Sequence, residues 1–213
     1  KTIGDTLIYI GGDLGRVDSY AFARVGLHNS ASYGNGKVKI HIKGGINCVD
    51  STYTFYQVGI FTNNDVEVII DGSIDIIRDM WTFRELGAYV NGGTAKIAIA
   101  GHLGDPHKSA FYQAGRQMTN GSIAISIGRG VGILGNATFH EVGFECQNTS
   151  IEIYIGGQVF EIGVWCFGRI AYNSIDSGVD IKIGGNVGII QERAFYDLGY
   201  CGSLKSSDKA ISI

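Results

Sequence analysis

The sequence predicts a β-solenoid, in which copies of one short unit stack as parallel strands around a phenylalanine-lined core. Phe recurs every 28 residues along most of the chain, as from Phe83 to Phe111, and Gly follows four residues later in every copy but one, which has Ala171. The seven anchors are Phe22, Phe55, Phe83, Phe111, Phe139, Phe167 and Phe195. Alternating aliphatic residues precede each anchor, which indicates a strand. A fixed period of this length is typical of solenoids, propellers and other repeat arrays.

The repeat and the composition predict one domain spanning residues 1–213 and argue against nucleic-acid binding and membrane insertion. The chain has 33 Gly and one Pro, which favours many tight turns inside regular structure. A net charge of −3 and a pI of 5.9 leave no basic stripe, so we expect no nucleic-acid partner. No apolar run reaches the ~18 to 20 residues that a membrane-spanning helix needs, so we expect no membrane insertion.

The strands follow in order along the chain. In the first copy, Ile8 and Ile10 precede a glycine pair, and a polar loop over residues 28–36 explains why the first two anchors are further apart. Later copies alternate in the same way, through Val38, Ile40 and Ile42; Val66, Val68 and Ile70; Ile97 and Ile99; Ile123, Ile125 and Ile127; Ile151, Ile153 and Ile155; Val179, Ile181 and Ile183; and, in a terminal strand, Ile211 and Ile213. β-Branched residues suit a pleated, half-buried surface, so these aliphatics should point inward.

The residues between the aliphatics should form two outward columns, whose neighbours lie ~4.8 Å apart. One column is Leu7, Lys39, Glu67, Lys96, Ala124, Glu152 and Asp180. The other is Tyr9, His41, Ile69, Ala98, Ser126, Tyr154 and Lys182. Lys39 and Glu67 should attract each other across adjacent strands, whereas Glu152 beside Asp180 should not. On the remaining faces we expect turns and short irregular or helical pieces.

The end of each copy resembles a known repeat. Val187-x-x-Ile190-x-x-x-Ala194-Phe195-x-x-Leu198, with Leu14-x-x-Val17-x-x-x-Ala21-Phe22-x-x-Val25 as a second instance, resembles the BspA-like leucine-rich repeats of bacterial and protozoan surface proteins. The resemblance implies a leucine-rich-repeat-like β-solenoid in a secreted or cell-surface protein, with adhesion to an extracellular protein or glycan as its function. Gly stands here in place of that family's usual Pro.

Two motifs could bind a cofactor or metal, and we expect neither to do so. Gly130-x-Gly132-x-x-Gly135 matches a dinucleotide fingerprint, but that fingerprint needs a following helix, and the repeat predicts a turn and an extended segment. His102 and His107 flank the only Pro, where an irregular turn is the better interpretation than a zinc site. The four cysteines share no column, so most should be buried free thiols.

Acidic residues raise the possibility of catalysis. Stacking should bring together an acidic neighbourhood of Glu141, Glu145, Glu152, Glu161 and Asp180. Glycosidases use two carboxylates at a set separation, and polysaccharide-active enzymes on β-helix scaffolds are one alternative function. A structural spacer in a longer surface protein is another. No pair is singled out, so a solvated acidic face is the preferred interpretation and we expect no enzyme activity.

The predicted function is therefore non-catalytic recognition through the outer strand face. Tyr is a favourable contact residue because it supplies area at low entropic cost. The candidate ligand-binding residues are Tyr9, His41, Ser126, Tyr154, Glu152, Asp180 and Lys182. Tyr20, Tyr53, Trp81 and Trp165 lie two residues before their anchors, and we expect this column to cover the edge of the core rather than to bind a ligand.

Overall fold

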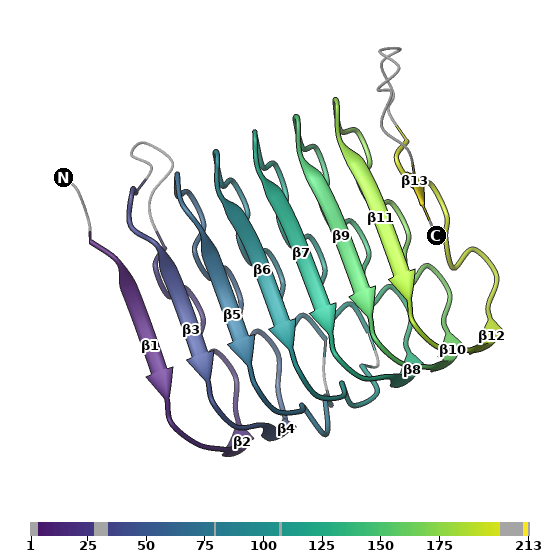
Figure 1. Ribbon diagram of the computed structural model, residues 1–213, viewed down its shortest axis with the longest axis horizontal. Helices are drawn as coiled ribbons and strands as arrows, with labels where there is room; N and C mark the ends of the chain where they lie inside the picture. Colours follow the sequence, from purple (N-terminus) through teal and green to yellow (C-terminus); the bar gives the residue numbers. More distant parts are fainter. Residues whose placement is uncertain (1–3, 28–33, 79, 107, 201–210, 213) are drawn as a thin grey trace.

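A computed structural model describes residues 4–27, 34–78, 80–106, 108–200 and 211–212, and these form one stack of coils with parallel strands (Figure 1). The strands are β1 Thr6–Ile10, β2 Leu14–Val17, β3 Val38–Ile42, β4 Ile46–Val49, β5 Val66–Ile70, β6 Thr94–Ile99, β7 Ser122–Ile127, β8 Val131–Leu134, β9 Ser150–Ile155, β10 Val159–Ile162, β11 Gly178–Ile183, β12 Val187–Ile190 and β13 Ile211–Ser212. The predicted parallel β-solenoid is confirmed. His107, Cys201 and Ile213 lie outside the described residues.

The alternating aliphatics form one eight-stranded parallel sheet in the order β1-β3-β5-β6-β7-β9-β11-β13. The inward residues of its central strands are fully buried, as in the alternating burial of β6 and β7. The register pairs Leu7 with Lys39 and then Glu67, and Ser126 with Tyr154 and then Lys182. Both predicted outward columns are therefore correct.

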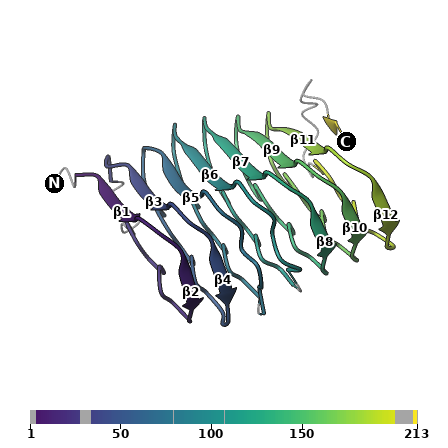
Figure 2. The same ribbon diagram turned by 60° about the horizontal axis from the view of Figure 1, so that its bottom comes forward.

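A second sheet occupies the next side of each coil, where the sequence had predicted turns, irregular or helical pieces and, over the glycine fingerprint, a short extended segment (Figure 2). It consists of β2 paired with β4 and of β8, β10 and β12, and isolated bridges such as Ile74 to Leu103 link the two parts. In β10, Val159 and Ile162 are buried while Phe160 between them is exposed. Buried residues three apart lack the two-residue period of a strand, so the sequence pattern did not reveal this sheet.

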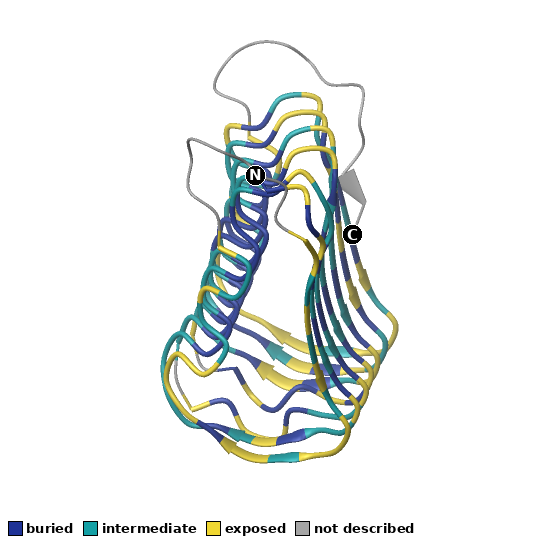
Figure 3. Ribbon diagram, turned by 90° about the vertical axis from the view of Figure 1, so that its left-hand side faces the viewer, coloured by how far each residue is buried: buried dark blue, intermediate teal, exposed yellow. Residues whose placement is uncertain are grey.

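The third side is a column of turns, and no helix occurs in the part of the chain that the structure describes (Figure 3). Within each turn, bonds run to the residue three positions earlier, as from Leu86 N–H to the Phe83 carbonyl. Other backbone groups bond to the adjacent coils, such as Gly87 N–H to the Val58 carbonyl and Glu85 N–H to the Tyr112 carbonyl. This side thus satisfies its backbone between coils without helix or strand.

The glycine four residues after each anchor is favoured for two reasons: its φ is positive, and a side chain at this position would have no room. Gly87 has φ +63, and a β-carbon there would lie 2.4 Å from Cβ of the inward Ala95. Ala171, the one exception, keeps the same left-handed backbone with φ 54. The repeated glycine therefore marks a point where the turn side packs directly against the eight-stranded sheet.

The phenylalanine anchors form a continuous ladder through the core. Phe55, Phe83, Phe111, Phe139 and Phe167 are all 0% exposed. Successive ring centroids lie 4.7 to 5.1 Å apart and adjacent planes differ by 5 to 8°. Phe22 and Phe195, at the two ends of the ladder, are only partly buried. The sequence prediction that the anchor column fills the core is confirmed.

Candidate recognition surface on the outer strand face

The outer face of the eight-stranded sheet carries three columns of side chains rather than two. The additional column starts one residue before the first strands and consists of Asp5, Lys37, Asp65, Thr94, Ser122, Ser150 and Gly178. It is charged in the first three coils and hydroxyl-bearing or glycine in the later ones. This column was not predicted from the sequence, because its members precede the alternating aliphatics. The signal that indicates them is their common spacing from those aliphatics.

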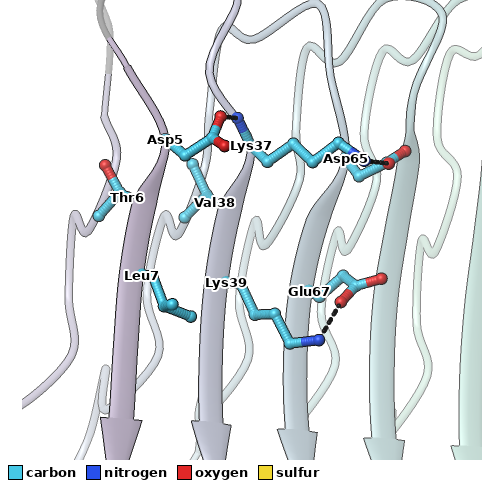
Figure 4. Close-up of a pocket in the computed structure, with 8 residues that line it drawn as sticks. All are labelled: Asp5, Thr6, Leu7, Lys37, Val38, Lys39, Asp65 and Glu67. Atoms are coloured by element: carbon cyan, nitrogen blue, oxygen red, sulfur yellow. Dashed lines mark hydrogen bonds and ion pairs between the residues drawn. The ribbon is translucent and has the colours of Figure 1, made fainter.

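The charged part of this column borders a hollow of about 360 Å³ over β1, β3 and β5 (Figure 4). Lys37 N–H donates to Asp5 Oδ1 over 2.8 Å, and Lys37 Nζ lies 3.2 Å from Asp65 Oδ2. Lys39 Nζ lies 3.1 Å from Glu67 Oε2 on the same face, which confirms the predicted attraction between these two residues. The paired charges leave this hollow with little net charge.

Tyr9 and His41 lie in contact near the same end of the sheet. Their ring centroids are 5.5 Å apart and the rings meet edge to face. Nε2 of His41 is 3.0 Å from a carboxylate oxygen of Asp71, which orients the imidazole. Tyr9 is 58% exposed, as its predicted outward position requires.

Small side chains cover the middle of the face. The outward residues of β7 are Ser122, Ala124 and Ser126, and they are only partly buried. Ser122 Oγ lies 3.0 Å from Thr94 Oγ1, so a pair of hydroxyl groups links β7 to β6 at this edge. The central strands therefore present a low strip that is polar at one edge.

Tyr154 on β9 stands beside this strip and is 40% exposed. Ser126 and Lys182 flank it in the register, and Glu152 lies next to Asp180. A depression of about 430 Å³ is lined here by Ser150, Ile151, Glu152, Gly178, Val179, Asp180 and Lys182.

Lys182 relieves the repulsion that the sequence predicted between the two carboxylates. Its Nζ hydrogen-bonds to Asp180 Oδ2 and lies 4.0 Å from Glu152 Oε1. The hydrogen bond to Asp180 raises the pKa of Lys182, and the charges of Asp180 and Glu152 act in the same direction. The lysine therefore stays protonated and joins the two acids into one charged group.

The structure does not bring the seven candidate residues into one patch. Tyr9 and Tyr154 are five strands apart in the same column, which corresponds to roughly 24 Å at the usual strand spacing. Ser126, Glu152, Asp180 and Lys182 surround Tyr154, whereas His41 belongs with Tyr9. The face thus has two separate candidate regions at opposite ends of a low central strip.

The predicted acidic neighbourhood was wrong as a single cluster, because its members lie on three different sides. Only Glu152 and Asp180 share the outer strand face. Glu141 and Glu145 lie in the turn side and accept hydrogen bonds from Gln113 and Gln117 of the preceding coil, over 2.8 and 2.5 Å. On β10, Glu161 accepts a bond of 3.0 Å from Gln191.

The glycine fingerprint and the His102 motif lack the surroundings that a nucleotide or metal site needs. β8 lies within the glycine fingerprint, and Gly135 is followed by turns and not by the helix that phosphate binding needs. Nε2 of His102 lies 3.2 Å from Asp75. Across the described ranges, no three His, Cys, Asp or Glu residues cluster as metal ligands would.

Two of the described cysteines are core residues. Cys146 and Cys166 are fully buried, and burial raises the pKa of both thiols, that of Cys146 to about 12. They are therefore protonated and unreactive at neutral pH. Cys48, the third free cysteine described, is partly exposed.

Comparison with known proteins found no matching family model, no matching curated protein and no matching solved structure. The resemblance to BspA-like repeats accordingly stays a prediction. Within the described residues, the chain has no helix of the length and apolarity that crossing a bilayer requires.

Proposed function

We propose that the chain is a non-catalytic recognition module of a secreted or cell-surface protein, and that it binds an extracellular protein or glycan through the outer strand face. The arrangement around Tyr154 is the main support. An exposed aromatic ring stands between a strip of small side chains and a charged rim formed by Glu152, Asp180 and Lys182. Burial of such a ring contributes affinity, while a rim of this kind fixes orientation.

Rigidity adds to this support. Every neighbouring strand pair from β1 to β11 is hydrogen-bonded in continuous parallel register, and the inward side chains of the central strands are fully buried. A surface held in this way loses little conformational freedom when a partner binds, which lowers the cost of association. The outward residues therefore keep fixed relative positions before any partner arrives.

Two observations favour recognition over the alternative functions. Glu152 and Asp180 lie side by side near Tyr154, and the ammonium of Lys182 contacts both of them. A glycosidase pair instead needs one carboxyl that is protonated and free to act as an acid. A spacer needs no exposed aromatic ring on this face, whereas Tyr154 is 40% exposed.

The test is a binding screen followed by a matched pair of substitutions. Glycan and extracellular-matrix arrays would identify a partner, and its affinity would then be measured for Tyr154→Ala and Tyr56→Ala. Tyr56 lies on the turn side, where it contacts Tyr53 with a centroid distance of 4.8 Å. We expect Tyr154→Ala to weaken binding at least tenfold and Tyr56→Ala to leave it within twofold. Unchanged binding by Tyr154→Ala, or equal losses in two folded variants, would exclude the strand face as the site.

A further inference from the structure

A column of side chains, most of them large, runs along the turn side two residues before each Phe anchor, and we call it the pre-Phe column. Its members are Tyr20, Tyr53, Trp81, Ser109, Ala137, Trp165 and Arg193. In the first three coils the rings stack on one another, with centroids 5.2 Å apart for Tyr20 and Tyr53 and 5.1 Å apart for Tyr53 and Trp81. Each ring in this part of the column covers a face of its neighbour.

The stack is interrupted at Ser109 and Ala137, so Trp165 has no ring of the column on the side of the preceding coil. A hollow of about 350 Å³ occupies this position and is lined by Asn136, Ala137, His140, Val164, Trp165 and Arg169. His140 borders it, with its ring centroid 5.8 Å from that of Trp165 and the planes tilted by 38°. On the other side, Tyr196 covers the indole edge to face at 4.7 Å. The hollow is therefore the place of a missing ring.

The polar groups around the hollow carry little net charge. The guanidinium of Arg169 lies 3.5 Å from Glu141 and 4.0 Å from Asp197, so its charge is compensated. Burial lowers the pKa of His140, and the charge of Glu141 opposes this effect. The imidazole is therefore neutral at physiological pH. A site with one aromatic wall and a compensated polar rim selects a neutral ligand.

We propose that this hollow binds one neutral pyranose ring, which occupies the position of the missing aromatic and stacks on the indole of Trp165. A pyranose has a flat C–H face for the indole and hydroxyl groups at its edge. The lining of the hollow includes the amide of Asn136, the imidazole of His140 and the guanidinium of Arg169, which form a polar rim. An aromatic side chain from a partner protein would cover this rim without offering polar groups, which is unfavourable, whereas sugar hydroxyls can pair with it.

This site is independent of the proposed strand-face function, because Trp165 and Tyr154 lie on different sides of the coil. The repeat itself supplies the variant that tests it. Ala137 already has φ 57, and the aromatic members of the column have φ values of 59, 66, 67 and 58 at Tyr20, Tyr53, Trp81 and Trp165. Ala137→Tyr should therefore keep the backbone and fill the hollow with the ring that the column lacks.

The experiment is a titration monitored by tryptophan fluorescence. Trp81→Phe leaves Trp165 as the single tryptophan of the two in the chain. In this background, methyl β-D-glucopyranoside, methyl β-D-galactopyranoside and methyl N-acetyl-β-D-glucosaminide would be titrated, with N-acetyl-L-tyrosinamide as the aromatic comparison. We expect a saturable change with at least one glycoside, at least tenfold weaker in Ala137→Tyr and unchanged in Tyr53→Ala.

No saturable change with any glycoside, or equal affinity in Ala137→Tyr, would refute the proposal. Saturation by N-acetyl-L-tyrosinamide alone would also refute it and would assign the hollow to an aromatic side chain of a protein partner. If Ala137→Tyr fails to fold, Trp165→Leu gives the same comparison through saturation-transfer NMR observed on the glycoside. Retained glycoside binding in that variant would equally overturn the assignment.

Discussion

Single residues in this fold act through their neighbours in the next coil, and Phe139 is the clearest case. Its ring is fully buried between those of Phe111 and Phe167, with centroid distances of 4.7 and 5.0 Å. Offset stacking of this kind adds to the stabilisation from burial. Because both faces of the ring are covered by neighbouring rings, a smaller side chain would leave a cavity that the flanking coils cannot readily close.

We therefore expect Phe139→Ala to lower the free energy of unfolding by about 3 to 5 kcal/mol, from lost transfer energy and the remaining cavity. Denaturant unfolding curves with comparable slopes would measure the change. Tyr9→Ala serves as the control, since this ring is 58% exposed and its loss should cost much less. A loss below about 1 kcal/mol for Phe139→Ala would contradict the role of the ladder in the core.

At the scale of elements, the eight-stranded sheet was predictable from the sequence and the other two sides were not. Alternation such as Ile123, Ile125 and Ile127, repeated in every copy, gives both the strands and their register, and hence the neighbours of Tyr154. Val159 and Ile162 are three residues apart, so their strand lacked the two-residue period.

The conformation of the turn side could not be predicted from the sequence, because it depends on left-handed backbone at non-glycine residues. Trp165 and Glu141 both have positive φ, a conformation that neither side chain favours by itself. The bonds between coils hold these residues in place. The hollow beside Trp165 was not predicted either. It depends on the small side chain of Ala137, and one small residue in a column that was expected to cover the core edge does not indicate a binding site.

The close approach of the turn side to the eight-stranded sheet gives a prediction for two glycines. Gly87 and Gly92 both have positive φ, but a β-carbon at Gly92 would meet nothing within 4 Å, whereas one at Gly87 would meet Ala95. Gly92→Ala should therefore lower the free energy of unfolding by about 1 kcal/mol, which is the cost of placing a β-carbon on a left-handed backbone. Gly87→Ala should cost roughly 1 to 3 kcal/mol more, because Ala95 has no rotamer with which to move away. Thermal melts of both variants would show the difference; equal losses would mean that close approach is not what selects glycine here.

At the scale of the whole molecule, each coil contacts mainly its two neighbours, so stability should vary along the stack. Inward residues of the central strands, such as Ile97 and Ile125, are 1% exposed, whereas Ile8 and Ile10 of β1 are only partly buried. Native-state hydrogen exchange should accordingly show the slowest amides in β6 and β7 and faster ones in β1 and β12. Uniform protection from β1 to β12 would instead indicate that the stack opens as one unit.

The Phe ladder also accompanies a constant spacing between coils along the whole stack. Because strand pairing and ring contact together keep successive coils about 5 Å apart, equivalent outward atoms repeat at the same interval along the sheet. A polymeric partner whose own repeat is commensurate with this interval could place several of its units against several coils at once. After the first unit of the polymer binds, the following units are held near their own coils, so each weak contact increases the total affinity. That affinity would grow with the number of coils that the polymer contacts. Length matching, more than the strength of any one contact, would set which polymers the face selects.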